Sequence, residues 1–302
     1  LDDNGQMDVI YTDFQKAFDI INHQILLEKM RLHGFSGPLL SLFRSYLIDR
    51  QHCVRYRNCL SESFVPTSGV PQGSNLGPLL FLLFINDLPV NMSCDKLLFA
   101  DDLKLYYKIS SIDDCRTLQE NVNTLYLWCR TNQMILNRHK CYIMTFSRQK
   151  NPITYDYKIA DHTIQRAEYF KDLGVTFDNR LTFVPHINDV VRRSLNTLGF
   201  VHRSCREFTE IQPLITLFFA LVRSKLEYCS IVWSPLYSVH ITYLESVQRR
   251  FLKYLCFKLD GIYPDRGLSE DILLARFNFN SLRTRRLPQG VVFLFNLLHN
   301  KN

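Results

Sequence analysis

Runs of apolar residues separated by polar positions divide the first half of the chain into strand-like and helix-like segments. Residues 7–12 form a short apolar, β-branched run that ends directly before Asp13, which is typical of a buried strand. Residues 96–100 and 103–107 are two more apolar runs, separated only by Asp101 and Asp102. Because Asp tolerates the left-handed conformations that two-residue turns need, the sequence predicts a hairpin with these two residues at its tip.

Helical spacing of apolar residues alternates with further strand-like runs. The longest predicted helix covers residues 111–136, where Ser111 can cap the first turn and Asp113 and Asp114 suit its dipole. Between two predicted elements, Gly and Pro punctuate residues 69–77 and predict a tight, specially shaped loop. The remaining predicted helices cover residues 17–32, 38–48 and 76–88, and the remaining strands cover residues 51–57, 63–65, 141–146, 155–159 and 169–177.

The pattern changes after about residue 180. Amphipathic helices are predicted over residues 181–205, 211–228 and 241–257, and Arg and Lys recur along them. The fold class is therefore α+β: residues 1–180 are expected to form an antiparallel sheet with helices on one face, and residues 181–302 a mainly helical domain.

Composition narrows the class of protein. Of the 302 residues 46% are hydrophobic and 22% charged, which allows a large core and excludes a disordered chain. The most apolar run, residues 76–88, is too short and too interrupted to span a bilayer, so no membrane partner is expected. The nine scattered cysteines form no C-x-x-C pair and indicate reduced thiols of an intracellular protein, most of them in the core. The net charge of +7 suits a polyanionic partner, although many soluble proteins carry as much.

Carboxylates stand where predicted strands end. Asp13 follows the first strand, and Asp101 and Asp102 separate two others. Taken alone, the Asp pair favours an ordinary polar turn, and Asp13 a solvated strand end. Together, three hard oxygen ligands in one small sheet could hold divalent cations such as Mg²⁺, and two such ions could support phosphoryl transfer.

Five segments resemble, in order and approximate spacing, the motifs of reverse transcriptases. Residues 13–19 (DFQKAFD) resemble motif A, residues 68–74 (SGVPQGS) motif B, and residues 99–102 (FADD) motif C in the form found in non-LTR retrotransposons. Leu136-Asn137 with Lys140 resembles motif D, and residues 170–174 (FKDLG) motif E. Residues 226–235 and 244–250 are similar to the region that follows the polymerase domain in jockey-type, LINE-type elements. The resemblance covers nearly the whole chain, and five motifs in order are hard to obtain by chance.

The resemblance implies an RNA-directed DNA polymerase with a palm over residues 1–180, containing motifs A to E, and a helical thumb and C-terminal region over residues 181–302. In that family, residues matching Asp13, Asp101 and Asp102, with the backbone carbonyl of Phe14, hold two Mg²⁺ ions (Mn²⁺ is an alternative). Lys140 would act as a general acid toward pyrophosphate, although a solvated lysine fits the sequence nearly as well.

The resemblance also implies substrate contacts. Phe18 would exclude a 2′-hydroxyl as a steric gate, or would simply be a core residue; Pro71, Gln72 and Gly73 would approach the template and the dNTP. Phe170, Leu173 and Gly174 would position the DNA primer, or pack between palm and thumb. Arg192, Arg193, Arg249 and Arg250 would bind nucleic-acid phosphates, unless they belong to solvated helix faces.

The expected partners are an RNA template, a DNA primer and dNTPs, in the nucleus or cytoplasm. Fingers and an endonuclease are expected elsewhere on a longer polypeptide, so little polymerase activity is expected from this partial chain alone. Three alternatives stay open: a non-catalytic or domesticated nucleic-acid-binding domain, another palm-fold nucleotidyl transferase, and an inert remnant.

Overall fold

The computed structural model describes residues 5–88, 90, 92–265 and 267–299. The chain forms two compact units, Leu1–Glu168 and Tyr169–Asn302. The sequence placed the change of architecture near residue 180, whereas contacts divide the chain before Tyr169. The difference is the hairpin of β10 (Tyr169–Asp172) and β11 (Val175–Asp178), because buried Val175 belongs to the core of the second unit.

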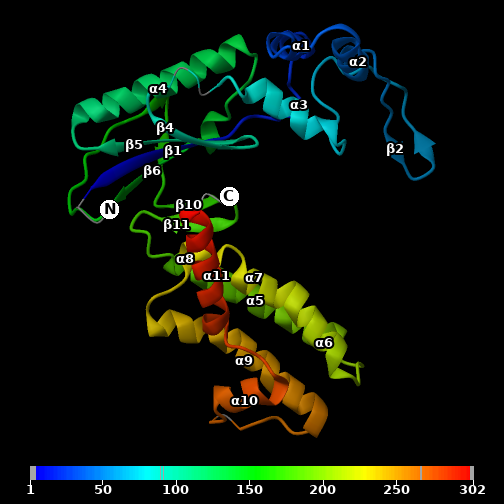
Figure 1. Ribbon diagram of the computed structural model, residues 1–302, viewed down its shortest axis with the longest axis vertical. Coiled ribbons are helices and arrows are strands. Elements are labelled where there is room, and N and C mark those ends of the chain that lie inside the picture. The colour runs from blue at the N-terminus through cyan, green and yellow to red at the C-terminus, as the bar shows by residue number, and fades with distance from the viewer. Residues whose placement is uncertain (1–4, 89, 91, 266, 300–302) are drawn as a thin grey trace. The chain divides into compact units, whose positions relative to one another are not determined.

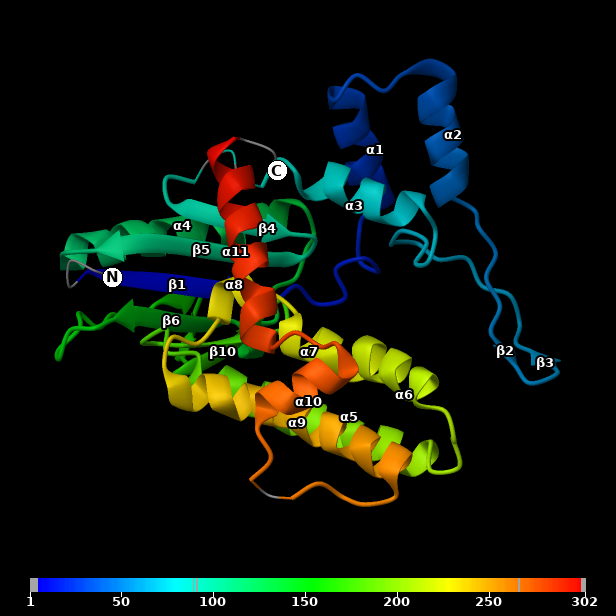
Figure 2. The same cartoon turned by 60° about the horizontal axis from the view of Figure 1, so that its bottom comes forward.

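A five-stranded sheet organises the N-terminal unit, with strand order β4-β5-β1-β6-β9 (Figures 1 and 2). Its strands are β1 (Gln6–Thr12), β4 (Asp95–Phe99), β5 (Asp102–Ile109), β6 (Tyr142–Ser147) and β9 (Gln165–Arg166). The apolar run of β1 takes the central place, as its burial requires. The sheet is antiparallel apart from the β6–β9 pair, which is parallel. The expectation of a purely antiparallel sheet is therefore wrong at this edge.

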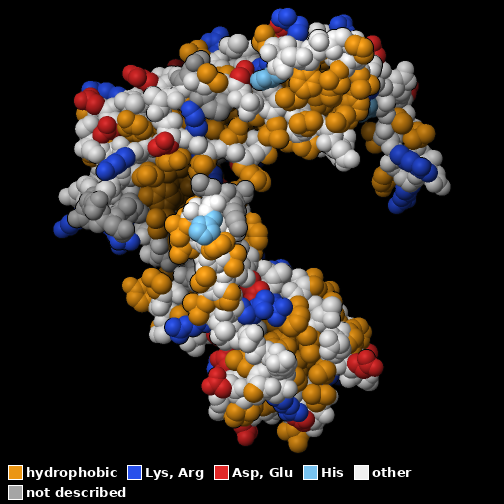
Figure 3. All heavy atoms as spheres, in the orientation of Figure 1, with side chains coloured by type: hydrophobic (Ala, Val, Ile, Leu, Met, Phe, Trp, Pro, Cys, Tyr) orange, Lys and Arg blue, Asp and Glu red, His pale blue; other side chains and the backbone are white. Residues whose placement is uncertain are grey.

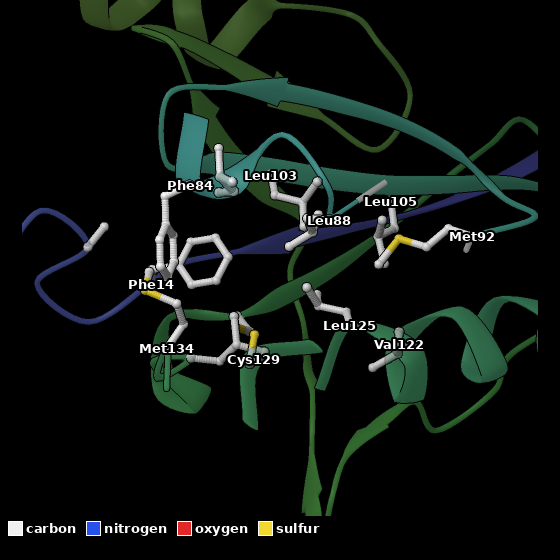
Figure 4. Close-up of a cluster of buried hydrophobic side chains, with 14 of the residues drawn as sticks. Phe14, Phe84, Leu88, Met92, Leu103, Leu105, Val122, Leu125, Cys129 and Met134 are labelled. Carbon is white, nitrogen blue, oxygen red and sulfur yellow. The ribbon is translucent and has the colours of Figure 1, made fainter. Parts of the chain in front are cut away.

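Helix α4 (Ile112–Thr131) packs against β5 on one face of this sheet, whereas α1 (His23–Leu32) packs against α2 (Gly37–Leu47) and α3 (Leu76–Ile85) beyond the sheet (Figures 1 and 2). The expectation that helices in general cover one face of the sheet is therefore met by α4 but not by α1 and α2. Figure 4 shows how Leu103 and Leu105 of β5 meet Val122 and Leu125 of α4 in a buried cluster that continues to Phe14. Burial of these side chains is the main force that holds the unit together, and it fixes the strand ends on which the candidate site lies.

Two helix boundaries differ from the sequence prediction for local reasons. α1 begins at His23 rather than near residue 17, because the Asn22 side chain accepts hydrogen bonds from the backbone N–H groups of Gln24 and Ile25. α4 begins as predicted, with a capping box between Ser111 and Asp114. It ends at Thr131 rather than near residue 136, since Leu136 pairs with Phe14 in an isolated antiparallel bridge.

Short ribbons complete the N-terminal unit. β2 (Arg55–Tyr56) and β3 (Cys59–Leu60) form a two-stranded ribbon where longer strands were predicted, and an isolated bridge between His52 and Phe64 extends it. β7 (Lys158–Ile159) and β8 (His162–Thr163) form another, so only the end of the run 155–159 is a strand. A 3₁₀ turn, η1 (Arg138–Lys140), connects α4 to β6.

The C-terminal unit is mainly helical, as predicted, and has a separate core in which Trp233, Phe218 and Phe251 are buried. Its elements are α5 (Val184–Ser204), α6 (Ile211–Leu217), the π-helical segment η2 (Phe218–Arg223), α7 (Ser224–Glu227), α8 (Ser230–Trp233), α9 (Ser238–Asp260), α10 (Glu270–Phe277) and α11 (Leu282–Leu298). The helix predicted over residues 211–228 is thus α6, η2 and α7 in succession. Among the described residues, no helix is both long and apolar enough to cross a membrane. All nine cysteines are free thiols, and six of them are buried.

Candidate functional site

The pairing of β1 with β5 brings the predicted acidic positions to one end of the sheet. Thr12, the last residue of β1, pairs with Leu103, and its Oγ1 donates to the Leu103 carbonyl at 3.0 Å. Asp13 follows Thr12 and Asp102 precedes Leu103, so these two are next in the same register. Residues that face each other across antiparallel strands have Cα atoms about 5 Å apart. The carboxylates therefore come from neighbouring strand ends.

The hairpin tip lies one residue earlier than the sequence predicted. Phe99 pairs with Asp102, which leaves Ala100 and Asp101 as the turn. Ala100, rather than an Asp, takes the left-handed conformation, with φ of +52°. Prediction of Asp101 and Asp102 as the tip is therefore wrong in detail: Asp101 lies in the turn, whereas Asp102 begins β5. The physical cause is the register of the strands, which local turn propensity does not reveal.

On its other side, Asp13 lies against the segment predicted as motif D. The Asn137 N–H donates to the Asp13 carbonyl, and the Gln15 N–H donates to the Ile135 carbonyl, both at 2.8 Å. In this antiparallel bridge the hydrogen bonds come from the residues that flank Phe14 and Leu136. The Phe14 carbonyl consequently faces the opposite side, where β5 begins.

Lys140 reaches the same place from η1. Its Nζ is 3.8 Å from Oδ2 of Asp13, and the two side chains are 67% and 38% exposed. A pair this open contributes little to stability, yet it puts an ammonium group beside a strand-end carboxylate. Among the residues that the structure describes, no three His, Cys, Asp or Glu side chains converge closely enough to hold a metal ion. The structure thus brings together the backbone of Asp13 and that of Asp102, and it pairs Lys140 with Asp13.

The loop predicted as motif B is fixed against the turns that follow Asp13. The Gly69 N–H donates to the Ile21 carbonyl at 2.8 Å, and the Val70 N–H to the Phe18 carbonyl at 2.9 Å. Gly69 has φ of +85°, and a Cβ there would lie 2.7 Å from the Asp19 carbonyl oxygen. Only glycine allows this approach, which explains the residue type at this point of the loop.

Asp19 and His23, to which the sequence assigned no individual role, also hold this loop. Gln72 Nε2 donates to Asp19 Oδ1 at 2.7 Å, and the Ser68 hydroxyl donates to the Asp19 carbonyl at 2.8 Å. His23 Nε2 lies 2.7 Å from the Gly69 carbonyl oxygen in a buried position. Asp19 is the last residue of the motif A segment, and this was the one sequence signal that could have singled it out; His23 gave none.

Phe18 and the loop tip have different surroundings. The half-buried Phe18 ring stacks on Phe81 of α3 with centroids 4.5 Å apart, so core packing holds it in place. Pro71 and Gln72 line an open pocket of about 630 Å³ together with Arg50, whereas exposed Gly73 has φ of +79° and open space where a Cβ would be.

The residues predicted as a primer grip form a tight hairpin rather than the single strand predicted over residues 169–177. Leu173 and Gly174, with φ of +43° and +88°, make the turn between β10 and β11. Tyr228 Oη donates to the Leu173 carbonyl at 2.9 Å, and its ring lies 3.1 Å from where a Gly174 Cβ would be. Phe170 pairs with Phe177 across the hairpin. Tyr228, which follows α7, therefore braces this turn within the C-terminal unit.

The four arginines predicted to bind phosphates differ in their surroundings. Arg192 and Arg193 on α5 both pair with Asp189, at 2.5 and 2.7 Å. Desolvation of Asp189 raises the pKa of its carboxyl, but the hydrogen bond from Arg192 and the charge of Arg193 outweigh it and lower that pKa overall. Arg249 is half-buried on α9, and Arg250 is exposed.

Comparison with known proteins identifies the family of the chain. Residues 4–200 match the family "Reverse transcriptase (RNA-dependent DNA polymerase)". The chain is 35% identical over 202 residues to the probable RNA-directed DNA polymerase from transposon BS of Drosophila melanogaster, covering 64% of this chain and 22% of that protein. It is 26% identical over 258 residues to the RNA-directed DNA polymerase from mobile element jockey of Drosophila funebris, covering 80% of this chain and 28% of the relative.

Among solved structures, apo telomerase from Candida tropicalis aligns with a TM-score of 0.46 and 10% identity, covering 85% of this chain and 43% of that one. The family match spans more than half of the chain and includes both strand ends of the candidate site. The chain therefore belongs to the reverse transcriptase (RNA-dependent DNA polymerase) family, and it is similar to the enzymes of LINE-type, jockey-like elements.

Proposed function

We propose that the N-terminal unit is a polymerase palm that extends a DNA primer on an RNA template, and that the C-terminal unit is its thumb-like partner. The observation that carries this proposal is the β1–β5 register, because it sets Asp13 beside the hairpin of Asp101 and Asp102. Membership of the reverse transcriptase family supports the same reaction. The non-catalytic alternative has no observation in its favour.

The chemistry of the donor set supports binding of divalent metal ions, although the described side chains do not converge on one point. Asp13, Asp101 and Asp102 supply hard carboxylate oxygens from adjacent strand ends, and the Phe14 carbonyl faces the same side. These four residues would hold two Mg²⁺ ions, or Mn²⁺ in their place. When bound, such ions stabilise the attacking 3′-oxygen of the primer and the leaving oxygen of pyrophosphate.

The role of general acid is assigned to Lys140, and its pairing with Asp13 supports this assignment. Its ammonium group lies 3.8 Å from the Asp13 carboxylate in an exposed pair, so it can turn toward a bound triphosphate without leaving a buried charge unpaired. In this role, Lys140 gives a proton to the pyrophosphate oxygen as the bond to the α-phosphorus breaks.

Specificity and strand positioning fall to the surrounding loops. Phe18 would place its ring against the sugar of the dNTP, held by its stack on Phe81. Pro71, Gln72 and Gly73 would contact the template and the nucleotide from residues 69–77, the glycine-rich loop. Phe170, Leu173 and Gly174 would hold the primer end, with Tyr228 as their support. Arg249 and Arg250 would bind nucleic-acid phosphates. Arg192 and Arg193 would do so after giving up their ion pairs with Asp189.

Metal binding tests the proposal without requiring activity. Titration of the chain with Mn²⁺, followed by the electron paramagnetic resonance signal of the free ion, should show binding that Asp13→Asn and Asp101→Asn each weaken by more than roughly tenfold. Asp161→Asn, an exposed carboxylate in the β7–β8 turn, is the matched control and should leave binding unchanged. Equal binding by all four proteins would refute the metal site.

Primer extension on an RNA template tests the reaction itself. Where extension is measurable, Asp101→Asn should reduce the rate more than roughly 100-fold, since it removes a ligand of the ions that carry the chemistry. Lys140→Gln should reduce it by about 10²-fold, with a greater loss at the chemical step than in KM. Extension that persists in Asp101→Asn would overturn the assignment.

A further inference from the structure

The ribbon arm, defined as residues 51–65, lies outside the site described above. Every residue in it is exposed. The backbone of His52 exchanges two hydrogen bonds of 2.8 Å with that of Phe64, Arg55 pairs with Leu60 and Tyr56 with Cys59. In both ribbon views the arm extends away from α2 and the sheet of its unit (Figures 1 and 2). A two-stranded ribbon of this kind is only marginally stable in water by itself, so a ligand that docks on it would stabilise it.

The arm is positively charged and aromatic. Together with Arg50 at its base, the arm holds three arginines and one histidine against a single acidic residue, Glu62. Neither Arg55 nor Arg57 has an acidic partner among the residues that the structure describes. The Arg57 guanidinium lies over the ring of Tyr56, 5.5 Å from its centroid, and Tyr56 is 70% exposed. Figure 3 shows basic side chains beside apolar ones at the end of the arm.

The base of the arm is continuous with the glycine-rich loop. Arg50 Nε donates to the Leu47 carbonyl at 3.2 Å, which anchors the first strand. Arg50 and His52 line the same open pocket of about 630 Å³ as Asp19, Ser68 and Gln72. A strand that occupies this pocket would therefore reach the arm without crossing the core of the unit.

We propose that the ribbon arm binds a single-stranded nucleic acid, with Arg55 and Arg57 on its phosphates and Tyr56 stacked on a base. Unpaired cations interleaved with an exposed aromatic ring are the chemistry that binds single strands without reading sequence. The proposal depends on the proposed function only for the source of that strand, which could be the RNA template or a DNA strand. A protein strand added to the ribbon edge is the competing occupant, but it gives no reason for the unpaired arginines.

The test is binding of fluorescein-labelled oligouridine RNA to the full chain, measured by fluorescence anisotropy over a range of salt concentrations, with EDTA and without dNTP. Arg55→Gln/Arg57→Gln should weaken binding roughly tenfold at low salt and reduce the salt slope by about 1.4, or about 0.7 per phosphate contact. The matched control is Arg31→Gln/Arg116→Gln, which removes two exposed arginines of the same unit that pair with Glu28 and Asp113 at 2.6 Å. The control should bind as the unaltered chain does.

Equal losses in the arm variant and the control would show a general charge effect and overturn the proposal, as would unchanged binding, which is the outcome expected if a protein occupies the arm. Tyr56→Leu should weaken binding several-fold without changing the salt slope. The titrations are repeated with a labelled single-stranded DNA of equal length. The nucleic acid whose binding is weakened more by Arg55→Gln/Arg57→Gln is the preferred ligand of the arm.

A second measurement needs no substitution. Cys59 on the arm is an exposed free thiol, so bound RNA should slow its reaction with a maleimide. Unchanged labelling at saturating RNA would contradict the proposal. Since neither measurement requires metal or catalysis, an inactive chain that binds RNA through the arm would leave this inference intact while the proposed polymerase function failed.

Discussion

Asp8 is a charged residue fully buried in the middle of the central strand β1. Its carboxylate accepts hydrogen bonds from Gln6 Nε2 at 3.1 Å, Thr145 Oγ1 at 2.8 Å and Tyr157 Oη at 2.9 Å. Burial, and then the charge of Asp8, raise the pKa of Tyr157, so the phenol stays protonated and keeps donating. Because Gln6 and Tyr157 are buried and Thr145 is half-buried, the carboxylate is a structural centre rather than a ligand site.

Asp8→Ala should therefore lower the free energy of unfolding by about 3 kcal/mol or more, since it removes the common acceptor of Gln6, Thr145 and the buried Tyr157 hydroxyl. Urea denaturation followed by circular dichroism measures this. The control is Asp156→Ala, at an exposed position of the same unit, which should change stability by less than about 0.5 kcal/mol. A small effect of Asp8→Ala would mean that water enters and satisfies the donors.

His186, at the start of α5, is a second buried polar residue. The Thr176 N–H donates to its Nδ1 at 3.1 Å, which requires an unprotonated nitrogen there. Desolvation is the main cause that lowers the pKa of His186 to about 4; the charges of Arg193 and Lys171 act in the same direction, and Asp189 opposes them. The imidazole is thus neutral in the folded protein at pH 7.

This pKa predicts loss of stability on acidification. The unfolded chain protonates His186 near its ordinary pKa of about 6.5, whereas the folded chain does so only near 4. Stability from this residue is complete above about pH 6.5, falls as the pH drops toward 4, and changes no further below that. His186→Asn, which keeps an acceptor but does not titrate, should shrink the difference in unfolding free energy between pH 7 and pH 5 by about 2 kcal/mol. An unchanged difference would contradict the neutral assignment.

Among the elements, the glycine-rich loop between the ribbon arm and α3 depends most on close backbone contact. Gly69→Ala should lower the unfolding free energy by about 2 kcal/mol or more, because φ is positive and the new Cβ would lie 2.7 Å from the Asp19 carbonyl. Gly73→Ala is the matched control: its φ is also positive, but nothing lies within 4 Å of the new Cβ, so it should cost only about 1 kcal/mol. Urea denaturation of both variants compares them, and equal losses would show that backbone strain alone decides the effect.

Elements whose signals are local were predicted from the sequence, and those that depend on distant partners were not. The run before Asp13 predicted β1, and Ser111 marked the start of α4. The hairpin at Leu173 was missed because leucine gives no turn signal. Its carbonyl instead accepts a hydrogen bond from Tyr228, which lies far along the chain. The tip at Ala100 was misplaced by one residue for the same reason, since cross-strand pairing sets it.

At the scale of the whole molecule, the chain has two cores and one tryptophan in each unit, Trp128 and Trp233. Leu118→Ala should lower the unfolding midpoint reported by Trp128 more than that reported by Trp233, and Leu255→Ala should do the reverse. Both leucines are fully buried, so each substitution should cost about 2–5 kcal/mol in its own unit. Fluorescence of single-tryptophan variants, Trp233→Phe and Trp128→Phe, reports each unit, and identical shifts in both would show one cooperative unit.

The sequence by itself determined the acidic motifs, their order along the chain, the helical character of the second half and the resemblance to a family that residues 4–200 then matched. These follow from residue type and spacing, which are local. Only the tertiary structure decided that Asp13 meets the start of β5, that Lys140 pairs with Asp13, and that Asp19 holds Gln72. Each joins residues far apart in the chain, and burial of the shared core, rather than any local preference, brings them together.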